Sequence, residues 1–123
     1  MAQVLVAEDE AFTAMALVDH LEDLGHTVRD AADGAVAIRL LDEFEPDVVV
    51  TDLTMPNVDG CELIRRLRSR PGRTIPVILI TAVPQGRLPA GLTYDGYLGK
   101  PVDPEALARM VTRFSNGNGA AMP

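Results

Sequence analysis

The sequence predicts an α/β fold, in which a parallel sheet is covered by helices on both faces. Short apolar runs rich in β-branched residues alternate along the 123 residues with segments whose apolar side chains recur at helical spacing. This alternation is typical of βαβ units, in which a helix joins two parallel strands. The hydrophobic share of 47% supports a buried core, and the length fits one domain.

The first half of the chain is predicted to contain three strands and two helices. The strands are the runs QVLVA at 3–7, TVRD at 27–30 and DVVVT at 47–51. The first helix spans 11–24, where leucines recur at helical spacing, and it ends at Gly25. The second helix follows Asp33, a residue suited to cap its N-terminus, and ends before Pro46.

The second half is predicted to add two helices, at 61–70 and 103–114, and two strands, at 76–81 and 94–98. The segment 82–93 breaks the alternation because it contains two Pro and two Gly. Each Pro inside a helix costs about 3 kcal/mol, so a loop or a single turn is expected there. The last residues, 115–123, are expected to form a disordered tail, which leaves 1–114 as the domain.

The composition excludes several classes of protein. A net charge of −7, an aromatic share of 4% and the absence of Trp argue against direct binding of nucleic acid. A single Cys excludes a disulfide framework and a multi-cysteine metal site. No apolar run approaches the roughly 20 residues that span a bilayer, and no signal-peptide pattern opens the chain. We therefore expect a cytoplasmic protein, a monomer or weak dimer, that does not bind membranes.

The charges are divided unevenly along the chain. Residues 1–60 contain 14 acidic and two basic residues, whereas 61–123 contain four acidic and nine basic ones. Ten of the 11 basic residues are Arg, so the sole lysine, Lys100, marks a place where Arg does not serve. The arginines between 65 and 73 form either a solvated helix face or a docking surface, and the sequence leaves both open.

Polar residues suited to phosphate chemistry occur where the predicted strands end. Glu8 and Asp9 follow the first strand, Asp52 the third, Thr81 ends the fourth, and Lys100 follows the fifth. Ligands of such sheets bind at the carboxyl ends of the strands, so these side chains are expected to meet. Clustered carboxylates favour binding of Mg²⁺, and a carboxylate beside Mg²⁺ can attack phosphorus to give an aspartyl phosphate.

Short motifs occur in an order that is specific as a set, although each is weak alone. They are Glu8-Asp9, Asp52, Met55-Pro56 with Asp59-Gly60, Thr81-Ala82, and Tyr97-Leu98-Gly99-Lys100-Pro101. In this order they resemble the receiver domain of two-component response regulators, over about residues 3–114. The resemblance implies a flavodoxin-like, doubly wound sheet of five parallel strands in the order 2-1-3-4-5. The fourth helix would here be short or absent.

The resemblance also implies a role for each matched residue. Asp52 would accept the phosphoryl group and, with Glu8, Asp9 and the backbone carbonyl of Thr54, would hold Mg²⁺. Lys100 would pair with Asp52 before phosphorylation and contact the phosphoryl group afterwards.

Two further residues match the family's switch positions. Thr81 would hydrogen-bond a phosphoryl oxygen and move inward on activation, and the ring of Tyr97 would follow it. The peptide bond between Lys100 and Pro101 would be cis.

Simpler roles remain open: Thr81 as an ordinary strand residue, Tyr97 as core packing, and the acids after the first strand as caps of the helix that follows. Cys61 is interpreted as a small buried apolar residue rather than a redox site.

The resemblance implies a signalling module that receives a phosphoryl group from a histidine kinase or a histidine phosphotransfer protein and acts on an unknown downstream protein. A phosphate shuttle or sink without output is one alternative, and a receiver-like module that binds partners without phosphorylation is another. An aspartyl-phosphate phosphatase of the haloacid dehalogenase type is disfavoured, because such enzymes need a second Asp two residues after the nucleophile. Thr54 stands there instead.

Overall fold

A five-stranded parallel sheet forms the centre of the computed structural model, which describes residues 1–55 and 59–115. The strand order is β2-β1-β3-β4-β5, as the family resemblance implies. The strands are β1 (Gln3–Ala7), β2 (Thr27–Ala31), β3 (Val48–Asp52), β4 (Val77–Thr81) and β5 (Gly96–Gly99). Because all five run in the same direction, their carboxyl ends lie along one edge of the sheet.

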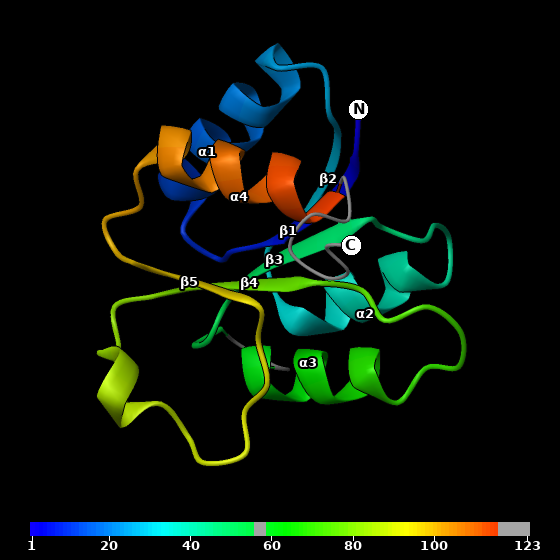
Figure 1. Cartoon of the computed structure of the whole chain (residues 1–123), viewed down its shortest axis with the longest axis vertical. Coiled ribbons are helices and arrows are strands. Elements are labelled where there is room, and N and C mark those ends of the chain that lie inside the picture. The colour runs from blue at the N-terminus through cyan, green and yellow to red at the C-terminus, as the bar shows by residue number, and fades with distance from the viewer. Residues whose placement is uncertain (56–58, 116–123) are drawn as a thin grey trace.

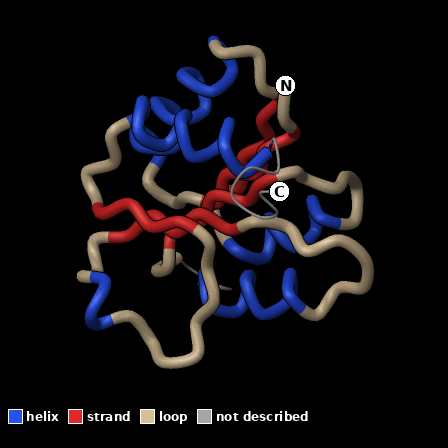
Figure 2. The backbone as a smooth tube through the Cα atoms, viewed as in Figure 1, coloured by secondary structure: helices blue, strands red, loops and turns tan. Residues whose placement is uncertain are grey.

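Helices cover both faces of the sheet, which confirms the predicted doubly wound architecture (Figures 1 and 2). One face carries α1 (Ala11–Asp23) and α4 (Pro104–Ser115), which contact each other. The opposite face carries α2 (Gly34–Leu41) and α3 (Gly60–Arg68), which also contact each other. None of the helices in the described part of the chain is long and apolar enough to cross a membrane.

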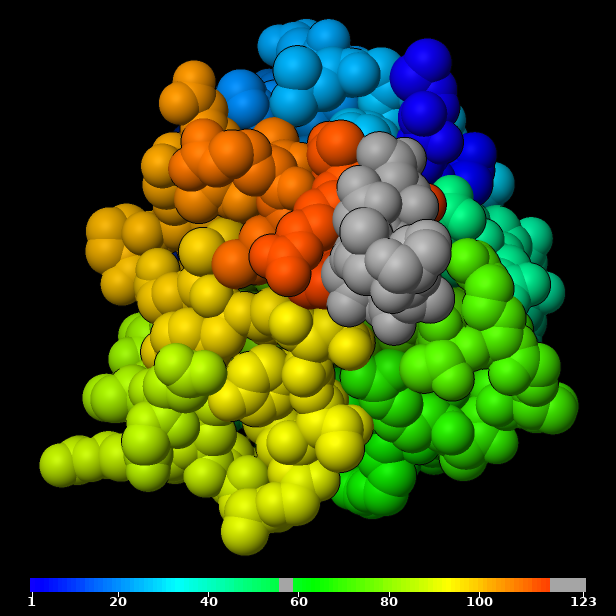
Figure 3. Space-filling model, viewed as in Figure 1, coloured from blue at the N-terminus to red at the C-terminus, as the bar shows by residue number. Residues whose placement is uncertain are grey.

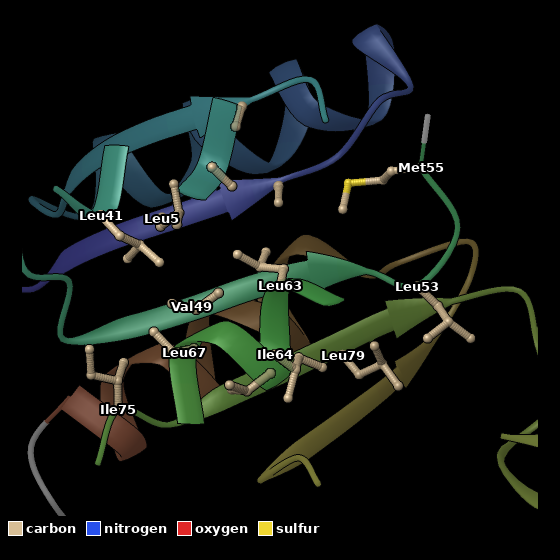
Figure 4. Close-up of a cluster of buried hydrophobic side chains, with 14 residues drawn as sticks. Leu5, Leu41, Val49, Leu53, Met55, Leu63, Ile64, Leu67, Ile75 and Leu79 are labelled. Carbon is tan, nitrogen blue, oxygen red and sulfur yellow. The ribbon is translucent and has the colours of Figure 1, made fainter. Parts of the chain in front are cut away.

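The core consists of two clusters, one on each face of the sheet. Successive side chains of a strand point to opposite faces, so Val4 and Val6 of β1 pack with α1 and α4, whereas Leu5 packs with α2 and α3. Figure 4 shows the second cluster, in which Leu63, Ile64 and Leu67 of α3 lie against the sheet. All of β3 and β4 is buried, which explains their nearly continuous runs of β-branched residues.

The predicted elements are all present, but several boundaries differ. The second helix ends at Leu41, well before Pro46, because residues 42–44 turn back to bond the carbonyl groups of Arg39 and Leu40. Strand β3 includes Asp52 as its last residue, and β5 begins at Gly96 rather than at 94. Ser115, expected in the tail, is the last residue of α4, whereas residues 116–123 lie outside the described residues.

The segment between β4 and β5 contains a single short turn of 3₁₀-helix, η1 (Gln85–Arg87), as the two prolines predicted. It packs on the α2/α3 face through partly buried Val83, Leu88 and Leu92. Tyr94 and Tyr97 lie against the same cluster, with their ring centroids 6.4 Å apart. The chain therefore crosses this face as an irregular segment, which confirms that the helix expected between β4 and β5 is reduced to a single short turn.

Candidate functional site

Three of the predicted site residues meet at the carboxyl edge of the sheet. Glu8 directly follows β1, Asp52 ends β3, and Lys100 directly follows β5. The Lys100 Nζ atom lies 2.8 Å from Asp52 Oδ2 and 2.8 Å from Glu8 Oε1. Both carboxylates are buried, at 2% exposure for Glu8 and 5% for Asp52. One lysine thus joins two buried acids from strands that are distant in sequence.

Asp9 completes a cluster of three carboxylates. One oxygen each of Glu8, Asp9 and Asp52 lies within 4.8 Å of the other two. Asp9 is exposed, so the cluster opens to solvent on its side. Carboxylate oxygens at this spacing, one of them open to water, suit a hard divalent cation such as Mg²⁺, which keeps several of its waters when bound.

Burial dominates the electrostatics of Glu8. It raises the pKa of this carboxyl above its usual value, although the contacts with Lys100 and with the backbone N–H of Glu10 oppose the shift. The Glu10 N–H donates to Glu8 Oε2 at 2.9 Å. Among the described residues, Glu8 Oε1 has only the ion pair with Lys100, which is not directed as a hydrogen bond. A buried carboxylate oxygen left without a hydrogen bond fits a site that accepts a second cation.

Lys100 is held in place by its backbone as well as by its side chain. Its N–H donates to the carbonyl of Thr81 at 2.9 Å, and the peptide bond to Pro101 is cis, as expected. Partial burial lowers the pKa of the ammonium group, but the hydrogen bond to Asp52 and the ion pair with Glu8 outweigh this, so the pKa lies above its usual value. The side chain therefore stays charged over the whole physiological range.

The Asp52 carboxylate is oriented by the loop that follows it. Its Oδ1 accepts from the N–H of Leu53 at 2.6 Å and weakly from that of Thr54 at 3.4 Å, while Oδ2 faces Lys100. Thr54 is exposed beside the cluster. Its assignment as a metal ligand through the backbone carbonyl stays a prediction, and Pro56 of the same motif lies outside the described residues.

Thr81 and Tyr97 both bond the backbone of one residue, Val83, rather than meeting at Asp52. The buried Thr81 hydroxyl accepts from the N–H of Val83 at 3.1 Å, and the Tyr97 hydroxyl donates to the Val83 carbonyl at 2.6 Å. Val83 thus connects the two predicted switch residues. The sequence predicted Thr81 and Tyr97 as a pair, but it gave no signal that the backbone of Val83 connects them.

Gly60 is a second residue whose importance sequence reasoning missed. Its N–H donates to the Leu53 carbonyl at 2.8 Å, and a Cβ atom there would collide with the carbonyl oxygen of Asp52. The start of α3 therefore touches the backbone of Asp52, and Asp59 caps the helix by accepting from the N–H of Glu62 at 3.0 Å. The Asp-Gly pair was the available signal, but it predicts a turn rather than close contact.

The family model described as the response regulator receiver domain matches residues 4–112. The chain belongs to this family. The receiver is 39% identical over 117 residues to an uncharacterised 14.6 kDa protein of Leptolyngbya boryana, covering 90% of this chain and 88% of that protein. It is 37% identical over 125 residues to the transcriptional regulatory protein PhoP of Escherichia coli, covering 97% of the receiver and 55% of PhoP, about half its length.

Solved structures agree with the assignment. The Francisella response regulator 1452 receiver domain superposes on this receiver with a TM-score of 0.86 and 32% identity, covering 95% of this chain and 98% of the other. Receivers are phosphoacceptor switches of two-component signalling and generally not enzymes with an external substrate.

Proposed function

We propose that this receiver accepts a phosphoryl group on Asp52 in a Mg²⁺-dependent reaction and signals through contacts with other proteins. The observation that carries the proposal is the convergence of Lys100 on two buried carboxylates, with Asp9 at the open side. Three negative groups around one cation leave an excess of negative charge. A divalent metal and a transferable phosphoryl group are the ligands that such a site suits.

In the proposed reaction, an Asp52 oxygen attacks the phosphorus of a phosphohistidine on a histidine kinase or a histidine phosphotransfer protein. The new bond is P–O and the broken bond is P–N, and the histidine ring leaves with the bonding electrons and takes a proton from water. Lys100, now 2.8 Å from Asp52, stays beside the reacting carboxylate and offsets the charge that the phosphoryl oxygens add.

Glu8, Asp9 and Asp52, together with the backbone carbonyl of Thr54, are the proposed ligands of Mg²⁺. The metal would supply positive charge against the phosphoryl oxygens. The donor set fits because it consists of oxygen atoms, one of which, Glu8 Oε1, is buried and receives no hydrogen bond from the part of the chain that the structure describes.

Thr81 and Tyr97 are proposed as the switch. If the Thr81 hydroxyl turns to a phosphoryl oxygen, the N–H of Val83 loses its acceptor, and the Val83 carbonyl that binds Tyr97 belongs to the same residue. The change at Asp52 thereby reaches the segment between β4 and β5. We propose residues 1–114 as the functional unit, acting in the cytoplasm on an as yet unidentified downstream protein.

The proposal is tested by incubating the protein with Mg²⁺ and acetyl phosphate and looking for an acid-stable, hydroxylamine-labile adduct. The wild type should gain one phosphoryl group, and the gain should be lost without Mg²⁺ and in Asp52→Asn. Asp59→Asn is the matched control, because Asn keeps the cap of α3 and position 59 lies outside the carboxylate cluster. A wild type that gains no phosphoryl group would favour a receiver that binds partners without phosphorylation.

A further inference from the structure

A groove lies on the α2/α3 face, between α3 and the irregular segment 89–93. Its volume is about 410 Å³, which falls within the range of binding sites in proteins. Its walls include Cys61, Ile64, Arg65, Arg68, Pro89 and Leu92. Because the chain between β4 and β5 forms only one short turn, no helix lies over this part of α3 in the described structure.

The α3 side of the groove carries more cations than carboxylates, in a chain whose net charge is −7. Arg65 and Arg68 line the groove, Arg66 follows Arg65 in α3, and the ion-pair partners of these three arginines are Glu62 and Asp95. Glu62 binds both Arg65 (2.6 Å) and Arg66 (2.9 Å), so two cations share one carboxylate. An acidic ligand would therefore be attracted to this face.

The two walls of the groove are the segments that leave the site. One wall begins at Cys61, directly after Gly60, which is bonded to the loop that follows Asp52. The other wall follows the segment that contains Thr81 and Val83 (yellow-green and yellow beside the green of α3 in Figure 3). A molecule in the groove would thus contact both connections from the carboxyl edge of the sheet.

We propose that this groove binds an acidic segment of a partner protein, with one apolar side chain of that segment in the cavity and a carboxylate at Arg65, the exposed arginine of its wall. The apolar lining from Ile64, Pro89 and Leu92 explains the need for an apolar side chain, and the excess of arginine explains the preference for acidic neighbours. A nucleic acid fits less well, because no aromatic side chain lines the groove for base stacking. The proposal goes beyond the phosphoacceptor function and does not depend on phosphorylation.

The chain contains its own reporter for this groove. Cys61 is the only cysteine of the 123 residues, it lines the groove, and it is partly exposed. Burial, followed by the charge of Asp59, raises the pKa of this thiol, so its alkylation is slow and is best measured at mildly alkaline pH. A molecule that fills the cavity should slow the alkylation further.

The test begins with selection of random peptides, displayed on phage, against the unphosphorylated protein. The enriched peptide is synthesised, and its affinity is measured for the wild type, Arg65→Glu and Arg109→Glu. Arg109 is an equally suitable exposed site on α4, on the opposite face of the sheet, and its reversal changes the net charge by the same amount. Cys61 alkylation by iodoacetamide is followed with and without the peptide, and an oligonucleotide serves as a second probe.

The proposal predicts enrichment of acidic peptides with a central apolar residue. Arg65→Glu should weaken their binding at least about tenfold, Arg109→Glu should weaken it far less, and the peptide should protect Cys61. Failure to enrich any peptide, enrichment without acidic residues, or equal loss in both variants would overturn the proposal. Binding without protection of Cys61, or protection by the oligonucleotide, would overturn it as well.

Discussion

Replacement of Gly60 by Ala should destabilise the receiver, an effect that the local sequence does not predict. Gly60 is the first residue of α3, where Ala would normally be harmless or favourable for a helix. A Cβ there would fall on the carbonyl oxygen of Asp52 and lie 2.9 Å from Leu53 Cα and 3.0 Å from the Asp52 carbonyl carbon. All three atoms are backbone, so the side chains cannot relieve the collision by changing rotamer.

The expected loss is about 1–3 kcal/mol of unfolding free energy, the usual result of overpacking, with more if β3 cannot shift. Gly86→Ala is the matched control, because no atom lies within 4 Å of its Cβ position and its φ is outside the left-handed region. That change should stabilise the protein by about 0.4–1 kcal/mol by restricting the unfolded chain. The two Gly→Ala changes should therefore have opposite signs.

The assay is urea unfolding of the wild type and the two variants, with the slope of free energy against urea compared as well as the midpoint. Since the colliding atom belongs to Asp52, folded Gly60→Ala should also take up phosphoryl groups from acetyl phosphate more slowly, on the order of 100-fold for a displacement of about 1 Å. A Gly60→Ala protein as stable as the wild type, or as stable as Gly86→Ala, would refute the close contact between α3 and β3.

Three further outcomes follow from the structure. Lys100→Met leaves two buried carboxylates without their cation, so the free energy of unfolding in urea should fall by about 1–3 kcal/mol. Mg²⁺ should restore part of this loss, and a loss that Mg²⁺ does not change would show that the missing charge is not its cause. Mg²⁺ should raise the melting temperature of the wild type, because it should add about 2.7 kcal/mol to the free energy of unfolding at a concentration of 100 times Kd. Asp9→Asn, at an exposed position, should need more Mg²⁺ for the same rise but should have the same stability without metal. His26 accepts at Nδ1 from the N–H of Ala2 at 3.0 Å, and burial, with the nearby N-terminal ammonium, lowers the pKa of its imidazole in the folded protein. The unfolded chain therefore binds the proton more tightly than the folded one. The urea midpoint should fall as the pH drops below the usual pKa of 6.5, and it should level off below the pKa of the folded protein. His26→Gln should remove that dependence, and an unchanged slope in this variant would assign it to another group.

Much of the fold was predictable because it rests on local patterns. Several of its features depend only on residues close in the sequence. They are the buried runs of β3 and β4, the cap at Asp33 and the two prolines of 82–93. The meeting of Glu8, Asp52 and Lys100 was predictable for a different reason: parallel strands end at one edge of a sheet.

Other features of the fold and of the site depend on contacts between distant residues, which no local sequence pattern predicts. Arg68 illustrates this, because it bonds the Ile75 carbonyl at 2.8 Å and pairs with Asp95 at 3.1 Å, and Asp95 in turn accepts from the N–H of Val77 at 2.8 Å. In the sequence, Arg68 is one arginine among several on an exposed helix. The bridge at Val83 and the contact of Gly60 with Asp52 are of the same kind, since both join residues from separate connections.

We expect the carboxylate of Asp52, and no other acid, to form the acyl phosphate. Borohydride reduces an acyl phosphate to an alcohol, so treating the phosphorylated protein and sequencing its peptides by mass spectrometry identifies the residue that carried the group. We predict reduction at Asp52 alone, and only in samples that contained Mg²⁺. Reduction at Glu8, at Asp9 or at any other acid, or at Asp52 in the absence of Mg²⁺, would contradict the account.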